Sequence, residues 1–292
     1  MVNAFEIDKI ILTGLKEDMP FGDITTDNLI DDTSQSEALL IAKDTGVIAG
    51  IDIAKRVFEI VDKNVVFEKR IEDGHRVKSG DVIAQIKGNT RALLKGERTA
   101  LNLLQRLSGI ATKTRELCEK IKDTNSKVVD TRKTTLGLRA LEKYAVKVGG
   151  GYNHRFSLSD GVMIKDNHIK AAGGIKEAVK KIRKKIPHTI KIEVETETLE
   201  QVEEALEAGA DIIMLDNMGV DKVRKAVKII NGSAISEASG NVNLDSIVEI
   251  AKTGVDIISV GSLTHSVSAF DISMKFKWLS SNRKDQLKFR IY

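Results

Sequence analysis

Short runs of β-branched and apolar residues alternate with amphipathic segments through the second half of the chain. Residues 128–131 and 161–164 are typical of buried parallel strands, and 136–148 between them has apolar residues at helical spacing. Further strands are predicted at 190–195, 212–215, 234–236 and 257–260, and further helices at 198–208, 220–230 and 244–253. Because βα units of a parallel sheet or barrel repeat every roughly 20 to 30 residues, this order predicts an α/β barrel over residues 109–266.

The first part of the chain has a different pattern. Alternating runs at 38–42, 47–51 and 82–86 are separated by glycines, and 53–61 has the spacing of a helix. These features predict an antiparallel sheet with helices against it over residues 1–108, and a domain boundary near Gly109. The polar, basic tail 267–292 is expected to pack back on this first domain, with its end frayed.

Composition narrows the classes of protein that fit this pattern. A chain of 292 residues that is 41% hydrophobic can bury one large core or two moderate ones. A net charge of only +4, together with 4% aromatic residues, argues against a nucleic-acid-binding surface. The single cysteine, Cys118, excludes an intrachain disulfide. The chain shows no signal-peptide pattern and no run of about 18 apolar residues, so we expect a cytoplasmic protein.

Charged side chains gather where the predicted strands end. The carboxyl ends of barrel strands share one rim, and active sites of this architecture lie there. The strand ends carry Arg132, Lys133, Lys165, Glu193, Glu195, Asp216, Glu237, Ser239, Gly240 and Gly261. Together with His154 and Arg155, these basic residues predict a pocket for a polyanion.

Six motifs, spread nearly end to end, resemble those of the quinolinate phosphoribosyltransferase family. They are GDITT at 22–26, ERTALNLLQRLSGIAT at 97–112, DTRKTTLGLRALEKYAVKVGGGYNHRFSLSDGVMIKDNH at 130–168, EVETETLEQVEEALEAGADIIMLDNM at 193–218, SEASGN at 236–241 and SVGSLTHS at 259–266. The resemblance implies an open α/β sandwich domain followed by an incomplete, TIM-like α/β barrel. It also implies a homodimer, or a hexamer built as a trimer of dimers.

The activity implied by this resemblance is a phosphoribosyl transfer. Quinolinate and phosphoribosyl pyrophosphate would react with Mg²⁺ as cofactor, giving nicotinate mononucleotide for NAD synthesis and releasing pyrophosphate and CO2. No protein nucleophile is required. As the ribose separates from pyrophosphate, positive charge grows on C1 and negative charge on the leaving group. Carboxylates near the ribose and cations near the pyrophosphate therefore stabilise the transition state.

The resemblance also implies roles for individual residues. The two quinolinate carboxylates would be held by Arg132, His154, Arg155, Lys165 and, from a neighbouring subunit, Arg98. Lys133 would face the phosphates, while Glu195 and Asp216 would address the ribose hydroxyls and, indirectly, a Mg²⁺ carried mainly by phosphoribosyl pyrophosphate. Lys133, Glu195 and Asp216 would be the catalytic residues. The other substrate-binding positions, mostly in two turns offering backbone N–H groups to the 5′-phosphate, are Thr131, Ser239, Gly240, Asn241, Val260, Gly261, Ser262 and His265.

Several of these residues could serve a different purpose. Lys165 could be the Schiff-base lysine of an aldolase-like barrel, although such an enzyme does not need the additional guanidinium groups. Glu195 and Asp216 could be helix N-terminal charges that complement helix dipoles. For Glu193, such a role or a structural pairing is the favoured interpretation. His154 could be a structural residue of its loop. A paralogous transferase associated with molybdenum transport and a non-catalytic anion-binding protein are the alternative functions. The complete basic set argues against the first, and the retained acids argue against the second.

Overall fold

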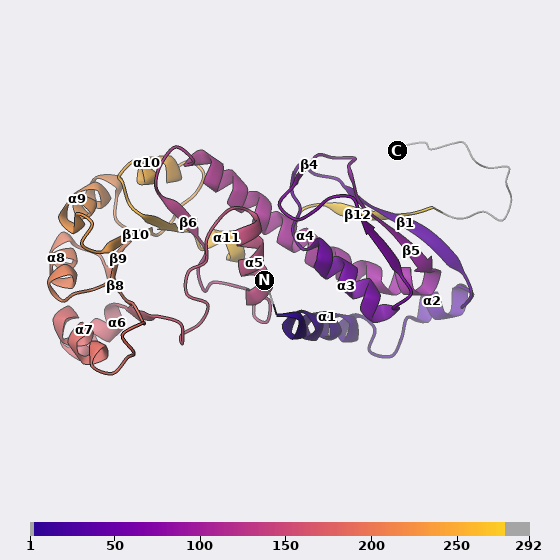
Figure 1. Ribbon diagram of the computed structural model, residues 1–292, viewed down its shortest axis with the longest axis horizontal. Coiled ribbons are helices and arrows are strands. Elements are labelled where there is room, and N and C mark those ends of the chain that lie inside the picture. The colour runs from indigo at the N-terminus through magenta and orange to yellow at the C-terminus, as the bar shows by residue number, and fades with distance from the viewer. Residues whose placement is uncertain (1–2, 278–292) are drawn as a thin grey trace. The chain divides into compact units, whose positions relative to one another are not determined.

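The computed structural model describes residues 3–277, and backbone contacts divide the chain into two compact units (Figure 1). The first unit contains the chain up to Gly109 and the segment from Ala269 onward, and the second contains Ile110–Ser268. Gly109, where the sequence predicts a boundary, lies inside the long helix α4, Thr90–Lys120. Among the described residues, no helix is long and apolar enough to cross a membrane.

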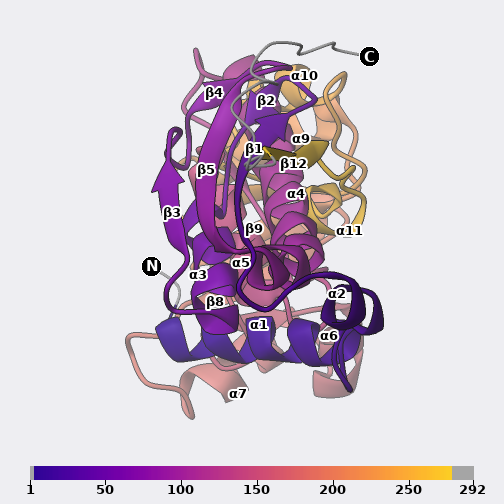
Figure 2. The same ribbon diagram turned by 90° about the vertical axis from the view of Figure 1, so that its right-hand side faces the viewer.

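An antiparallel sheet forms the centre of the first unit. Its strands follow the order β12 (Ile272–Lys277), β1 (Gln35–Ala42), β5 (Val82–Asn89) and β3 (Val66–Lys69), as Figure 2 shows. A separate pair is formed by β2 (Gly46–Val47) and β4 (Arg76–Val77), and the helices are α1 (Ala4–Asp18), α2 (Ile24–Leu29) and α3 (Ile51–Val61). Residues 278–292 of the tail, including the end expected to fray, lie outside the described residues.

The core of the first unit follows from alternation along β1 and from one apolar face of α3. Ala38, Leu40 and Ala42 are buried at every second position of β1, while α3 buries five apolar residues, the largest of them Phe58. Phe58 fits because Gly96 of α4 has no side chain: a Cβ there would lie 2.8 Å from the Phe58 ring. The strand predicted at 47–51 is wrong beyond Val47, since Ile51 already begins α3.

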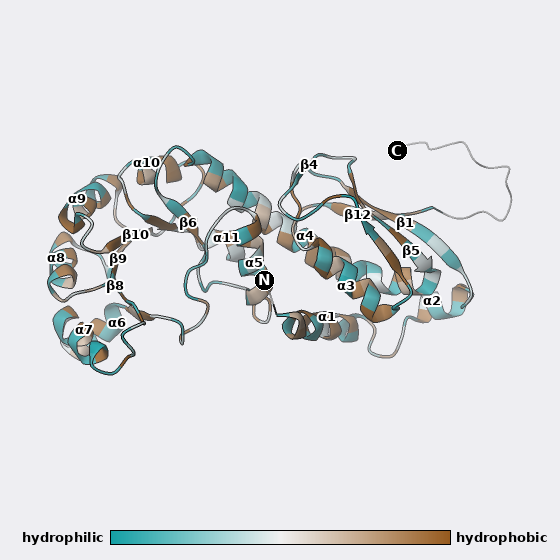
Figure 3. Ribbon diagram, in the orientation of Figure 1, coloured by the Kyte–Doolittle hydropathy of each residue, from teal (hydrophilic) through white to brown (hydrophobic). Residues whose placement is uncertain are grey.

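The second unit is built on a six-stranded parallel sheet. Its order is β6 (Lys127–Val129), β11 (Ile257–Ser259), β10 (Ile235–Ser239), β9 (Ile212–Asp216), β8 (Ile192–Thr196) and β7 (Val162–Ile164). The helices are α5 (Arg139–Val148), α6 (Asp166–Ala172), α7 (Ile175–Arg183), α8 (Leu199–Glu207), α9 (Val220–Ile230), α10 (Ile247–Ala251) and α11 (Ser262–His265). Within this unit the strands lie on the inside and α7 to α10 on the outside (Figure 1), and the strands are mostly hydrophobic (Figure 3).

This sheet does not close on itself in the described part of the chain, because β6 and β7 are its two edges. The edge of β6 is covered by a loop instead. Tyr152 forms a single parallel bridge with Val129, its N–H donating to Val128 O at 2.8 Å and its carbonyl accepting from Asp130 N–H at 3.1 Å. The predicted α/β class, with an antiparallel domain before an incomplete barrel, is confirmed.

Alternation along the parallel strands decides which side chains face the interior of the open barrel. The register pairs Met214 of β9 with Glu195 of β8 on one side and with Glu237 of β10 on the other. Residues that pair in register point to the same face of a sheet, and so do residues two positions apart on one strand. Asp216 and Ser239, two positions further along and also paired, therefore form a layer nearer the carboxyl ends of the strands.

Candidate active site

A cavity of about 770 Å³ opens at the carboxyl ends of these strands, within the second unit. Its lining contains these residues predicted from the sequence to bind substrate: Thr131, Arg132, Lys133, His154, Arg155, Lys165, Glu195, Asp216, Ser239, Gly240, Asn241, Gly261, Ser262 and His265. The structure thus brings residues from the ends of all six strands, and from the loops that follow them, to one opening.

Six further residues line the cavity that the sequence did not single out for binding: Met163, Met214, Asn217, Glu237, Val242 and Ser259. Four of them lie two positions before a predicted site residue. Met163 precedes Lys165 in this way, Met214 precedes Asp216, Glu237 precedes Ser239 and Ser259 precedes Gly261. The two-residue period of a strand was therefore the signal that could have found them.

Two predicted binding residues are not part of the cavity lining. Arg98 is an exposed residue of α4 and belongs to the first unit. Val260 is only 1% exposed, and its N–H donates to Val129 O at 2.9 Å, so this group is used by the sheet.

Lys133 is positioned by contacts of its backbone. Its N–H donates to the Thr131 hydroxyl at 3.0 Å, and its carbonyl accepts from the Thr264 hydroxyl of α11 at 2.7 Å. Gly261 leaves room for its side chain, because a Cβ at that position would lie 3.1 Å from Lys133 Cδ and 3.3 Å from the His265 ring. The loop after β6 and the turn after β11 therefore form one continuous wall of the cavity.

Positive charges are crowded in this cavity. Burial, and next the charge of Arg132, lower the pKa of Arg155. One Nη1–H of Arg155 donates to Gly161 O at 2.8 Å, which holds its guanidinium near the residue that precedes β7. Lys165, which directly follows β7, forms an ion pair through its ammonium group with Glu195 of the neighbouring strand β8. Repulsion among these cations is relieved by a strongly anionic ligand, so the arrangement selects for one.

His154 lies above two buried carboxylates. Its Nε2 is 3.1 Å from Glu193 Oε2 and 3.4 Å from Glu237 Oε2, and both acids are almost fully buried. Burial opposes a charge on the ring, but the hydrogen bonds and charges of Glu193 and Glu237 outweigh it and raise the pKa of His154 to about 10. Its Nδ1 accepts the N–H of Arg155 at 2.8 Å, so in this geometry the ring proton that faces the two carboxylates is on Nε2. The structural pairing predicted for Glu193 is thus present.

Close backbone turns after β9 and β10 form another part of the cavity wall. Asn217, directly after β9, has a positive φ of 51° and donates its N–H to Ser239 O at 2.9 Å. Gly240 has a φ of 106°, and a Cβ there would lie 2.1 Å from Asn217 Oδ1, so only glycine fits. Such turns bring the backbone close to a ligand.

Two groups of residues are candidates for holding a metal. Glu195 and Asp216 end neighbouring strands and both line the cavity, and carboxylates of this kind hold Mg²⁺ together with substrate phosphates. His154, Glu193 and Glu237 also lie close enough together to hold an ion. Mg²⁺ prefers oxygen ligands, and His154 Nε2 carries the ring proton when Nδ1 accepts from Arg155. Glu195 and Asp216 therefore fit the metal better.

Comparisons with known families agree across both units. The family model described as quinolinate phosphoribosyl transferase, C-terminal domain, matches residues 110–275. The model for the N-terminal domain of the same family matches residues 23–108. Together the two models account for nearly the whole described chain, in the order of the two units.

Individual proteins give the same result. A probable nicotinate-nucleotide pyrophosphorylase [carboxylating] of Bacillus subtilis is 50% identical over 273 residues, covering 94% of each chain. A solved structure of NadC from Streptococcus pyogenes is 45% identical with a TM-score of 0.91, covering 94% of this chain and 97% of that one. The structure of the nicotinate-nucleotide pyrophosphorylase of Francisella tularensis is 41% identical with a TM-score of 0.91, covering 95% and 98%.

Proposed function

The chain belongs to the quinolinate phosphoribosyltransferase family, and from this premise we propose how its cavity carries out the reaction. The enzyme transfers the phosphoribosyl group of phosphoribosyl pyrophosphate to quinolinate, giving nicotinate mononucleotide, pyrophosphate and CO2 in NAD biosynthesis. The observation that carries the proposed site is one cavity lined by both the basic cluster and the carboxylates Glu195 and Asp216.

The two carboxylates of quinolinate would be bound by Arg132, Arg155, His154 and Lys165. Guanidinium groups meet carboxylates through two parallel hydrogen bonds, which suits a planar dicarboxylate. Lys165 would exchange its bond with Glu195 for a substrate carboxylate, which releases Glu195 toward the ribose. The crowding of Arg132 and Arg155 supports this assignment, because a dianion relieves it.

Transfer of the ribose would use one set of side chains for the phosphates and another for the ribose. Lys133, as a compact charge, would face the phosphates, and the carboxylates of Glu195 and Asp216 would stabilise positive charge at the ribose C1. Mg²⁺ bound to phosphoribosyl pyrophosphate, and held through Glu195 and Asp216, would neutralise charge on the leaving pyrophosphate. Thr131, His265 and the turns at 239–241 and 260–262 would surround the 5′-phosphate.

Decarboxylation would need little more from the protein. Once the ribose is attached, the pyridine nitrogen is positive and can accept the electron pair left by the departing CO2. The cavity then has to keep the ring carboxylates oriented, and it does not need a nucleophile.

The function is tested by incubating the purified protein with quinolinate, phosphoribosyl pyrophosphate and Mg²⁺, and measuring nicotinate mononucleotide and CO2 together. We expect equal amounts of both products. Nicotinate and nicotinamide serve as competing substrates. Turnover of nicotinate without CO2, or no turnover by well-folded protein, would contradict the proposal.

We also propose that the chain works as a dimer, or as a hexamer of three dimers, with Arg98 reaching the cavity of the neighbouring subunit. Arg98 is exposed and is absent from the lining of its own chain's cavity, which supports a role in trans. Mixing Arg98→Ala and Lys133→Ala proteins should restore part of the activity, because a hybrid dimer has one intact site. No recovery despite demonstrated subunit exchange would rule out a shared site.

A cytoplasmic location is part of the proposal as well. The single cysteine suits a reducing compartment, although relatives from plants carry the words mitochondrial or chloroplastic in their names. Fractionation of the native cells, with detection by antibody, tests this location.

A further inference from the structure

A buried ion pair lies next to His154 and Arg155, two of the basic residues of the cavity. The two residues of this pair are not part of the cavity lining. Asp130 follows β6 and is 0% exposed, and Lys143 of α5 is 2% exposed. The Lys143 ammonium pairs with the Asp130 carboxylate. Burial raises the pKa of Asp130 and lowers the pKa of Lys143, so removing both groups from water opposes their charges. Buried pairs of this kind contribute little net stability compared with apolar residues of the same size.

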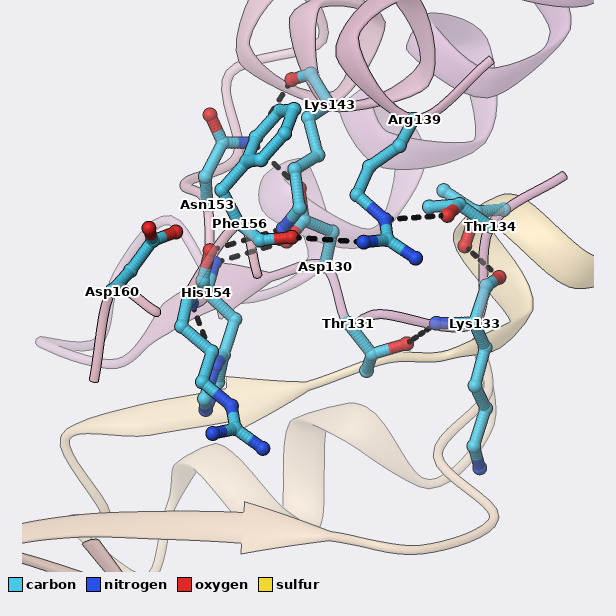
Figure 4. A network of polar contacts seen from close by, with 12 residues as sticks. Asp130, Thr131, Lys133, Thr134, Arg139, Lys143, Asn153, His154, Phe156 and Asp160 are labelled. Atoms are coloured by element: carbon cyan, nitrogen blue, oxygen red, sulfur yellow. Dashed lines mark hydrogen bonds and ion pairs between the residues drawn. The ribbon is translucent and has the colours of Figure 1, made fainter. Parts of the chain in front are cut away.

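The remaining hydrogen bonds of the pair converge on two adjacent residues (Figure 4). The N–H of His154 donates to Asp130 Oδ1 at 2.9 Å, and the His154 carbonyl accepts from Lys143 Nζ at 3.0 Å. Asn153 Nδ2 donates to Asp130 Oδ2 and, at 2.9 Å, to the backbone carbonyl of Lys143. The acid and the base therefore hold both backbone groups of His154.

Helix α5 holds the same loop at a second point. Arg139 donates to the Phe156 carbonyl at 3.2 Å and to the Thr134 hydroxyl at 3.0 Å, as Figure 4 also shows. His154 and Arg155, whose side chains line the cavity, lie between this contact and the buried pair. Residues 153–160 form neither helix nor strand, so these contacts fix the path of the loop.

We propose that Asp130 and Lys143 are positioning residues for dicarboxylate recognition, which set His154 and Arg155 at the separation that the two carboxylates of quinolinate require. The proposal rests on the proposed function, because it assumes quinolinate as the ligand of these two side chains. The pair holds the loop of His154 and Arg155, whereas the backbone of Lys133, assigned to the phosphates, is held by Thr131 and Thr264. Loss of the buried pair is therefore expected to weaken the binding of quinolinate and to spare the binding of phosphoribosyl pyrophosphate.

The test uses the double variant Asp130→Asn/Lys143→Met in the full-length protein. Asparagine matches aspartate in shape and methionine approximates the lysine stem, so both charges are removed without leaving one of them buried and unpaired. The variant keeps an acceptor for the His154 N–H but has no donor for the His154 carbonyl. Isothermal titration measures binding of quinolinate and of Mg²⁺-phosphoribosyl pyrophosphate separately, and steady-state assays give KM for each substrate.

We expect Kd and KM for quinolinate to rise about tenfold to a hundredfold, since small displacements of binding groups have effects of that order. Values for phosphoribosyl pyrophosphate should stay within about twofold. Lys147→Met is the matched control, because Lys147 is an exposed residue on the same helix and loses the same charge. It should leave both substrates unaffected.

Equal weakening of both substrates in the double variant, or no change in either, would overturn the positioning role. Thermal melting of each variant identifies a general loss of folding. Asp130→Glu, which keeps both charges of the buried pair and displaces the carboxylate by one methylene, then provides a milder perturbation whose selectivity for quinolinate is read in the same way. A wild-type protein that fails to bind quinolinate would instead refute the proposed function, so the two failures are distinguishable.

Discussion

The second unit contains two lysine–carboxylate pairs that differ in what surrounds them. Lys165 and Glu195 lie on the cavity, with side chains 45% and 14% exposed. Lys143 and Asp130 lie behind it, with side chains 3% and 0% exposed. The first pair can be exchanged for contacts with a ligand, whereas the second is joined to the backbone of the loop that carries His154.

This difference teaches that charge near an active site serves two purposes. A charge that a ligand can reach contributes binding energy directly. A charge that no ligand reaches, such as Lys143, contributes only through the geometry of the groups it holds. The two pairs therefore predict different losses of stability for the same kind of substitution, a large loss for the buried pair and a small loss for the pair on the cavity.

The largest effect is expected from Lys143→Met alone. It leaves the Asp130 carboxylate buried without its cation, and breaking a buried pair on one side costs about 3 to 5 kcal/mol of unfolding free energy. Urea denaturation measures this loss. Lys147→Met, with the same substitution on the exposed side of α5, should change the unfolding free energy by less than about 0.5 kcal/mol. A Lys143→Met protein as stable as the wild type would show that burial does not distinguish the two pairs.

The next effect concerns Lys165→Ala. Removing a charged hydrogen-bond partner costs on the order of 2 to 4 kcal/mol, and we expect this loss in quinolinate binding and a smaller one in phosphoribosyl pyrophosphate binding. Titration calorimetry with each substrate measures both. Lys170→Ala, on the exposed surface of α6, is the control. Equal losses for the two substrates would contradict the assignment of Lys165 to the dicarboxylate.

A third effect depends on pH. The pKa of His154 is raised to about 10, above the value near 6.5 of an unfolded chain, because the folded state favours the protonated ring. Its contribution to stability is therefore complete below about pH 6.5 and is lost as the pH rises toward 10. Unfolding in urea at pH 6.5 and 9.5 should show this decline in the wild type. In His154→Gln the fall in unfolding free energy between these two pH values should be smaller. An equal fall in both proteins would argue against a raised pKa of His154.

The smallest effect is the change in stability caused by Lys165→Ala. Its partner Glu195 remains near solvent, and exposed pairs contribute about 0 to 1 kcal/mol. The same urea experiments as for Lys143→Met measure this value. A loss as large as that of Lys143→Met would mean that the two pairs do not differ in kind.

How far the sequence alone predicts the fold depends on how local the signal is. Helix α9 begins and ends at the predicted residues, Val220 and Ile230, because its apolar positions keep one helical spacing throughout. Helix α4 is missed, although it is the longest element that the structure describes. Gly96 and Gly109 interrupt its pattern, and Gly96 is accounted for only by the Phe58 ring that it accommodates. That reason is a tertiary contact.

The site follows the same rule. Lys133, Lys165 and Asp216 are found from the sequence because a charged residue at the end of a predicted strand is a local signal. The barrel then brings the ends of its strands to the same rim. Lys143 cannot be found in this way, since a lysine on a helix usually lies on the solvent side. Only the fold shows that it is buried beside Asp130 and reaches the carbonyl of His154.

The bridge between Tyr152 and Val129 limits how the loop of residues 153–160 can change. An unpaired edge strand invites pairing with another chain and so promotes aggregation, and here the covering segment lies two residues before His154. A change of loop length that displaced Tyr152 would also uncover β6. Variants selected for new substrate preference should therefore be found among substitutions of side chains in this loop, and insertions or deletions should be lost first as insoluble protein.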